Sequence, residues 1–276
     1  MKKKIDLHTH TNYSDGDFSP KELIKLAQSR NINVLSITDH DSFDGYLNSK
    51  KLKLPKDFEI VPGLEISSSL NGKEVHLLGY FFDPEADILQ NQLEEIKAKR
   101  LLRAKKIIKK LNSSGVKIDI EQVKKIAGNS AICRPHIAHA MVNSGIVKNY
   151  YIAFKKFLRD DGPADVKKDN ISSIKAITVI HKAKGLVFIA HPVLLKDSEI
   201  EQLLPAVDGI ETIHPLHNKY KERKYKNYCK RYSLLESGGS DFHSKKRGDL
   251  KNLGKFTLPE RKFNSIKERR HELYDE

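Results

Sequence analysis

Short apolar segments in this chain repeatedly end in histidine or aspartate, and this pattern limits the folds that the chain can adopt. Residues 4–10 alternate in polarity, so His8 and His10 share one face of a predicted strand. Later segments with strand character end in residues of the same kind: His40, His191, Asp241 and His243. This pattern predicts an α/β fold in which histidines and carboxylates gather at the strand ends.

A predicted β-hairpin supplies two more residues of this kind. Residues 58–68 and 73–82 are predicted strands, and Asn71-Gly72 between them is a strong signal for a two-residue type I′ turn. Such a turn makes Glu65 and His76 diagonal neighbours on one face, with backbones roughly 7–8 Å apart. A metal ion can bridge that gap.

Nine residues of the metal-ligand type therefore lie at or near strand ends: His8, His10, Asp15, His40, Glu65, His76, His191, Asp241 and His243. Imidazole and carboxylate groups suit Zn, Mn and Fe. Nine ligands exceed the needs of one ion, so we expect two or three divalent ions. A pair of such ions can hold a hydroxide and clamp a phosphate. A single histidine at a strand end is more often a hydrogen-bonded structural residue, but nine such residues favour the metal interpretation.

A helical block interrupts the strand pattern. Residues 88–112 form a long predicted helix with a strongly basic polar face, and shorter helical stretches follow it. A basic face of this kind is usually only solvated, although it could guide nucleotide or RNA ends. Alternation of strands and helices resumes after residue 170. We expect an α/β domain of residues 1–87 and 171–276, and a helical insertion subdomain of residues 88–170.

Composition narrows the class of protein. The 276 residues carry a formal net charge of +14, which favours polyanionic partners such as nucleic acid or phosphorylated small molecules. No apolar run approaches the length of a membrane span, and the N-terminus has no signal-peptide core, so we expect a soluble, cytoplasmic protein without membrane contact. Two cysteines, Cys133 and Cys229, are too few for a disulfide framework.

The motifs together resemble the PHP family, the polymerase and histidinol phosphatase superfamily. The matching stretches span nearly the whole chain: Asp6-Leu7-His8-Thr9-His10, Tyr13-Ser14-Asp15-Gly16, Thr38-Asp39-His40-Asp41, Gly63-Leu64-Glu65-Ile66-Ser67, His76, Ala190-His191-Pro192 and Gly239-Ser240-Asp241-Phe242-His243. The resemblance implies a distorted seven-stranded (β/α) barrel and up to three metal ions. It implies one ion on His8, His10, Glu65 and Asp241, a second shared by Glu65 with His76 and His191, and a third on Asp15, His40 and His243.

Within this family, the helical block resembles the branch of nucleoside 3′,5′-bisphosphate phosphatases and 5′-3′ exoribonucleases that act on short RNA. The segment Cys133-Arg134-Pro135-His136 is similar to the substrate-binding segment of that branch. The resemblance implies that Arg134 and His136 contact a phosphate, a task that suits the planar guanidinium of arginine. Arg134 could instead be a solvated helix start. His214 and His217 follow another strand end and are candidates for substrate contact or general-acid work, or are ordinary loop residues.

The predicted function is phosphate hydrolysis from nucleotides, with a metal-bridging hydroxide held at Glu65 as the nucleophile. One alternative is a phosphatase for a small ester such as histidinol phosphate. A second is an amidohydrolase, although Glu65 and the Ser-Asp-Phe-His motif disfavour it. A third, of another class, is a non-catalytic module that binds nucleic acid.

Overall fold

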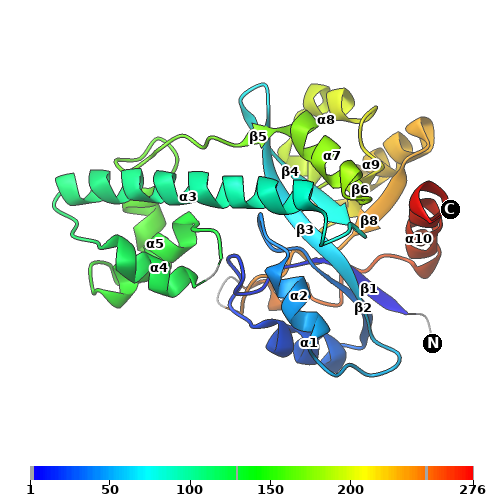
Figure 1. Cartoon of the computed structure of the whole chain (residues 1–276), viewed down its shortest axis with the longest axis horizontal. Helices are drawn as coiled ribbons and strands as arrows, with labels where there is room; N and C mark the ends of the chain where they lie inside the picture. Colours follow the sequence, from blue (N-terminus) through cyan, green and yellow to red (C-terminus); the bar gives the residue numbers. More distant parts are fainter. Residues whose placement is uncertain (1–2, 129, 246–247, 276) are drawn as a thin grey trace.

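The strands form one mostly parallel sheet (Figure 1). The computed structural model describes residues 3–128, 130–245 and 248–275. The main path follows the order β1-β2-β3-β4-β6-β7-β8, and a short strand, β5, pairs with β3. The strands are β1 (Lys4–Thr9), β2 (Ile32–Ile37), β3 (Glu59–Leu70), β4 (Lys73–Tyr80), β5 (Ile171–Ser172), β6 (Leu186–Ile189), β7 (Gly209–Ile213) and β8 (Leu235–Gly238). The predicted α/β class is confirmed.

The two ends of this strand path meet through the segment that follows β8. The backbone N–H of Asp241 donates to the carbonyl of His8 at 2.8 Å, and that of His10 donates to the carbonyl of Phe242 at 2.9 Å. A Cβ atom on Gly239 would lie 2.4 Å from the His8 nitrogen, so only glycine permits this approach. The polar residues at the ends of β1 and β8 therefore lie close together. The seven-stranded barrel stays a prediction.

The β3–β4 hairpin has the predicted register. Asn71 and Gly72 both have positive φ, 51° and 76°, as a type I′ turn requires. Glu65 consequently pairs with Leu78, and Ser67 pairs with His76. The two-residue turn therefore puts Glu65 and His76 on the same face, as predicted.

Within the described ranges, six α-helices accompany the sheet: α1 (Pro20–Ser29), α2 (Asp44–Lys50), α7 (Ser173–Lys182), α8 (Asp197–Leu203), α9 (Lys219–Tyr232) and α10 (Glu260–Tyr274). A capping box opens α1, because Ser19 accepts from the Glu22 N–H while Glu22 accepts from the Ser19 N–H. The sequence also predicts a helix over 171–184. Its first two residues instead form β5, and Ser172 caps a helix that begins at Ser173.

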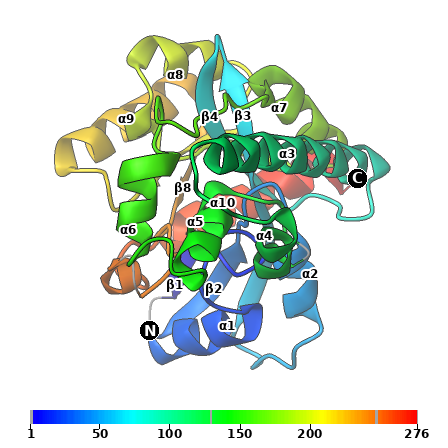
Figure 2. The ribbon, with the colours of Figure 1, turned by 90° about the vertical axis from the view of Figure 1, so that its left-hand side faces the viewer.

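The remaining helices form a block beside the sheet, seen from the near side in Figure 2. They are α3 (Asp87–Ser113), α4 (Ile120–Ala127), α5 (Arg134–Asn143), α6 (Tyr150–Ala153) and a π-helical turn at Phe154–Leu158. Figure 1 shows α3 reaching from the sheet to α4 and α5. Its N-terminal half (Leu89, Leu93, Ile96) packs into the core of the sheet, whereas its C-terminal half (Ala104, Ile107, Ile108, Leu111) packs into a separate core of the block.

Between Tyr80 and Ile171 the described residues contain no strand, as predicted. The predicted domain boundaries stay a prediction, with an α/β domain of residues 1–87 and 171–276 and a helical insertion of residues 88–170. Among the described ranges, every helix is too short or too polar to span a lipid bilayer.

Candidate metal centre

Glu65, a fully buried residue of β3, lies at the centre of the histidines. Five imidazole nitrogens surround its two carboxylate oxygens. Oε2 lies 3.3 Å from His8 Nε2, 3.3 Å from His10 Nε2 and 3.1 Å from His40 Nδ1, and Oε1 lies 2.8 Å from His76 Nδ1 and 2.9 Å from His191 Nε2. One carboxylate thus contacts histidines that lie on or shortly after four strands, β1, β2, β4 and β6.

Two aspartates complete the set. Asp241 Oδ1 lies 3.2 Å from the Nε2 atoms of both His8 and His10. Asp15 Oδ1 lies 3.3 Å from His243 Nε2 and 3.8 Å from His40 Nε2. All nine residues that the sequence singled out therefore meet in one place, and we refer to them as the nine-residue cluster.

Backbone conformation helps to aim these side chains. His191 and Asp241 follow β6 and β8 with positive φ values of 25° and 49°. Such values are uncommon for residues other than glycine and turn the chain sharply where the strand ends. On β1, the period of two places His8 and His10 on one face, while Ile5 and Leu7 point into the apolar core.

The hydrogen bond between His8 and Glu211 leaves Nε2 of His8 available as a ligand for a cation. Its Nδ1–H donates to Glu211 Oε1 at 2.9 Å, so a neutral imidazole carries its lone pair on Nε2. That lone pair faces the oxygens of Glu65 and Asp241, which are acceptors as well. Three acceptors that point at one place in a buried site repel one another unless a positive charge lies between them.

His243 repeats this arrangement. Its Nδ1–H donates to the carbonyl of Asp241 at 2.8 Å, which leaves the Nε2 lone pair facing Asp15 at 3.3 Å. Neither ring nitrogen of His10 makes a well-formed hydrogen bond within the described residues, although the side chain is fully buried. Buried polar atoms are normally hydrogen-bonded, and an imidazole nitrogen that faces two carboxylates without a well-formed hydrogen bond suits metal ligation.

The carboxylates of the cluster are held in the charged form. Burial alone would raise the pKa of Glu65, but His40, His76 and His8 hold it well below its usual value. Burial likewise opposes the charge on Asp241, and His8 and His243 hold its pKa well below the usual range. Burial disfavours the charged form of His10, yet Asp241 and Glu65 raise its pKa to about 9. The site therefore stabilises positive charge beside its carboxylates.

Comparison with known proteins places this arrangement in a family. Residues 6–155, more than half of the chain, match the PHP domain model. The chain belongs to the PHP domain family. It is 32% identical to a 5′-3′ exoribonuclease of Haemophilus influenzae, over 88% of this chain and 91% of the relative. It is 30% identical to a 3′,5′-nucleoside bisphosphate phosphatase of Chromobacterium violaceum, over 88% of each chain.

A solved structure has the same fold. A candidate metal-dependent phosphoesterase from Bifidobacterium adolescentis superposes with a TM-score of 0.87 at 25% identity, covering 97% of this chain and 96% of the other. The predicted family and branch are therefore confirmed.

Among the residues that the structure describes, four groups of side chains offer ligand atoms close enough to share an ion. They are His10, Asp15, His40 and His243; His8, His10, Glu65 and Asp241; His8, Glu211 and His214; and His40, Glu65 and His76. The second group matches the ligand set that the resemblance implied for one ion. The nine-residue cluster, together with Glu211 and His214, therefore offers several potential metal sites. These sites share the ligands His8, His10, His40 and Glu65.

Sequence reasoning missed Glu211, a fully buried residue of β7. Besides binding His8 Nδ1, it accepts the backbone N–H of His191 at 2.7 Å. Burial would raise its pKa, but the neighbouring His8 lowers it, so Glu211 is a charged partner for His8. The available signal was a glutamate inside the apolar segment 209–213.

Two aspartates that flank His40 hold the loops of the site. Asp39 accepts from the Thr11 N–H at 2.7 Å and from the Ser14 hydroxyl at 2.6 Å, which fixes the loop that carries Asp15. Asp41 accepts from the Ser67 N–H at 2.7 Å. The motif Thr38-Asp39-His40-Asp41 therefore supplies one candidate ligand and two supports.

The helix α3 contributes Arg100 to the edge of the site. Its Nε donates to Asp41 Oδ2 at 2.8 Å, its Nη2 donates to the Ser67 hydroxyl at 3.0 Å, and its Nη1 contacts Cys133 Sγ at 3.0 Å. The Asp41 carboxylate raises the pKa of Arg100 further, although burial opposes it. Arg100 thus ties both α3 and the start of α5 to the sheet.

His136 also joins the helical block to the site. Its Nδ1 accepts the Cys133 N–H at 3.0 Å and its Nε2–H donates to the carbonyl of Ser14 at 2.8 Å, so both nitrogens have protein partners. The Arg134 guanidinium donates to the Leu158 carbonyl at 2.9 Å and to Asp160 at 2.6 Å. Their predicted contact with a phosphate stays a prediction.

The two other candidate histidines differ in position. His214 is buried, accepts the Leu216 N–H on Nδ1, and directs Nε2–H to Asp241 Oδ2 at 3.2 Å. His217 donates from Nδ1 to the Thr212 carbonyl at 3.1 Å, and its ring lies 4.9 Å from that of Tyr225. His214 therefore lies against the cluster, while His217 packs one step further out.

Proposed function

We propose that this chain is a metal-dependent phosphoesterase that removes phosphate from nucleotides, namely nucleoside 3′,5′-bisphosphates or the 5′ ends of short RNA. The observation that carries the proposal is the arrangement around Glu65, where imidazole nitrogens converge on the buried carboxylate oxygens at 2.8–3.3 Å. Membership of the PHP family and the names of the two curated relatives support the substrate class.

The proposed cofactors are two or three divalent ions, Mn, Fe or Zn, as the mixed imidazole and carboxylate ligands suit. His8, His10, Glu65 and Asp241 would hold one ion, Glu65 with His76 and His191 a second, and Asp15, His40 and His243 a third. Bound ions would supply Lewis-acid activation of water and neutralise charge on the phosphoryl oxygens. Glu65 would be the shared ligand, and Glu211 would hold His8 in the tautomer that presents Nε2.

Other side chains would act on the substrate. Arg134 and His136 are the proposed phosphate contacts, and the Arg134 guanidinium would exchange its exposed partner Asp160 for substrate oxygens. His214 is the stronger candidate for a proton donor, because its Nε2–H already points at Asp241 inside the cluster. His217 is the weaker one, since it lies further from the cluster.

We also infer the finer architecture. The sheet of residues 1–87 and 171–276 would form the distorted seven-stranded barrel, supported by the bonds between the segment after β8 and β1. Residues 88–170 would be an inserted helical subdomain, supported by their separate apolar core. This block would cover the open side of the site where substrate enters.

A phosphate-release assay with added Mn²⁺ tests the proposal. Adenosine 3′,5′-bisphosphate, a 5′-phosphorylated short RNA and histidinol phosphate are compared side by side. We expect the nucleotides to be hydrolysed with the higher kcat/KM, and His8→Ala to abolish release and reduce bound metal. Preference for histidinol phosphate would contradict the substrate class. Absence of both metal and hydrolysis in the wild-type protein would favour a binding module instead.

A further inference from the structure

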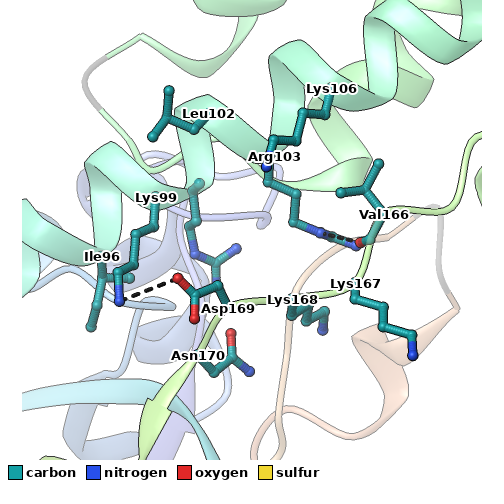
Figure 3. A pocket seen from close by; sticks show the side chains of 11 residues that line it. Ile96, Lys99, Leu102, Arg103, Lys106, Val166, Lys167, Lys168, Asp169 and Asn170 are labelled. Atoms are coloured by element: carbon teal, nitrogen blue, oxygen red, sulfur yellow. Dashed lines mark hydrogen bonds and ion pairs between the residues drawn. The ribbon is translucent and has the colours of Figure 1, made fainter.

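A strongly basic groove runs between α3 and the segment that precedes β5 (Figure 3). Its first part is lined by six cationic side chains: Lys99, Arg100, Arg103, Lys106, Lys167 and Lys168. An adjoining pocket shares Lys106 and Lys167 and adds Lys109 and Lys110. Each part is also lined by one carboxylate. Asp169 lines the first part, and Asp165 lines the adjoining pocket. We call this feature the α3 groove.

The walls of the groove are held at a fixed separation. Arg103 Nε donates to the Val166 carbonyl at 2.7 Å, as Figure 3 shows, and Lys110 Nζ donates to the Asp165 carbonyl at 2.5 Å. Lys99 Nζ lies 3.4 Å from Asp169 at the other end. These contacts occur along one face of α3, where residues four and seven apart are neighbours, so the groove is built into the fold.

The inner end of the groove reaches the nine-residue cluster. Arg100 lines the groove and binds Asp41, which follows His40 in the chain. Lys168 lines it as well and pairs with Glu74, whose carboxylate lies 3.1 Å from His76 Nε2. An anion in the groove would therefore lie next to side chains that contact the cluster.

The length of the groove distinguishes between possible anions. Ten residues of helix separate Arg100 from Lys110, and at a rise of about 1.5 Å per residue this spans about 15 Å. A mononucleotide held at the cluster cannot also occupy a track of that length. A chain of phosphates can, and basic side chains spaced along a groove are the usual device for following such a chain.

We propose that the α3 groove binds the phosphates of a single-stranded oligonucleotide whose terminal phosphate lies at the nine-residue cluster. The inference rests on the proposed phosphoesterase function and assigns it an oligonucleotide substrate. No residue that lines the first part of the groove is aromatic, so the contact is with the backbone and not with the bases. Binding is then independent of base sequence and strongly dependent on salt.

The test compares two double variants with the wild-type protein. Lys106→Ala/Lys167→Ala removes two exposed lysines of the groove that make no ion pair between described residues. The matched control, Lys105→Ala/Lys125→Ala, removes the same charge from exposed lysines of the helical block that do not line the groove. A fluorescent 5′-phosphorylated RNA of about ten nucleotides, within the usual range of single-strand sites, is titrated by anisotropy in EDTA.

We expect the groove variant to bind the RNA on the order of tenfold more weakly at low salt, and the control to match the wild type. The slope of log Kd against log salt should fall by about 1.4, because each single-strand phosphate contact contributes about 0.7. With Mn²⁺, the ratio of kcat/KM for the RNA to that for adenosine 3′,5′-bisphosphate should fall by a similar factor.

Equal losses in both variants, or an unchanged ratio in the groove variant, would overturn the proposal. Wild-type protein that does not bind the RNA would overturn it as well. Binding that depends on the groove, with no hydrolysis of either substrate, would instead remove the phosphoesterase function and leave the groove as a nucleic-acid site. The two failures are therefore distinguishable.

Discussion

The nine-residue cluster and the α3 groove both concentrate charge, but they do so in opposite ways. In the cluster, buried histidines and carboxylates from separate strands converge on Glu65, so a change at one residue affects several others. In the groove, lysines and arginines from α3 and from the segment before β5 lie near the surface, and they come from two stretches of the chain only. The first arrangement suits a small cation with strict geometry, and the second suits a flexible polyanion.

We expect the largest loss of activity from the substitution Glu65→Gln in the cluster. This change keeps the shape of the side chain but removes the charge shared by five imidazoles, so bound metal and transition-state stabilisation are lost together. We expect kcat/KM to fall by at least about 10³-fold. Phosphate release and elemental analysis of the purified protein measure the two effects. The matched control is Glu94→Gln, an exposed glutamate of α3, which should retain full activity.

Removal of Arg100 tests the junction between the two regions. The Asp41 side chain is fully buried, so Arg100→Ala leaves its charge without the guanidinium partner. We expect the free energy of unfolding to fall by about 3 kcal/mol. Urea denaturation provides the measurement, with Lys105→Ala on the same helix as the control.

Adding Asp41→Asn to Arg100→Ala sharpens that test. The second change removes the unpaired negative charge of Asp41, so we expect the double variant to regain part of the lost free energy of unfolding. A loss below about 1 kcal/mol in the single variant would contradict a role for this pair in joining α3 to the sheet.

We expect a smaller loss of metal affinity from Glu211→Gln. This substitution changes a hydrogen-bond partner of His8 and leaves all nine residues of the cluster in place. The amide no longer supplies a charged acceptor for His8 Nδ1, so His8 becomes a weaker ligand through Nε2. We expect metal affinity to fall about 10–100-fold, measured by competition with a chelator. Glu272→Gln, an exposed change on α10, is the control. An unchanged affinity would mean that Glu211 only packs against His8.

The smallest expected effect concerns Cys133, at the junction of the two regions. Burial raises the pKa of this thiol to about 11, with Arg100 opposing the shift. Because the thiolate is the reactive form, alkylation of Cys229→Ser protein at pH 8 should be slow and should rise about tenfold per pH unit up to about pH 11. Mass spectrometry after timed iodoacetamide treatment measures the rate. Rapid labelling at pH 8 would mean that the junction opens readily.

The sequence predicted the cluster because local rules were enough. The two-residue turn at Asn71-Gly72 determines the register of the hairpin, and the period of two then puts Glu65 and His76 on one face. His8 and His10 follow from the same period on β1. The remaining histidines lie at strand ends, which meet wherever parallel strands share a sheet.

Contacts between distant segments were not predictable in this way. Glu211 looks like any strand residue until His8 is placed beside it, more than two hundred positions away. Arg100 belongs to a run of basic residues that pattern alone assigns to solvent, yet it is the member that reaches a buried carboxylate. The bond between His136 Nε2 and the carbonyl of Ser14 likewise joins positions 122 residues apart, and no local pattern indicates it.

The backbone of Ser240 binds the side chain of Asp6 across a separation of 234 residues. A ribosome synthesises β1 with His8 and His10 long before it reaches Asp241 and His243. During most of translation the early histidines thus lack two of their later neighbours. A nascent chain therefore cannot assemble the full cluster, so any hydrolysis of RNA would begin only after this last segment has emerged and docked on β1.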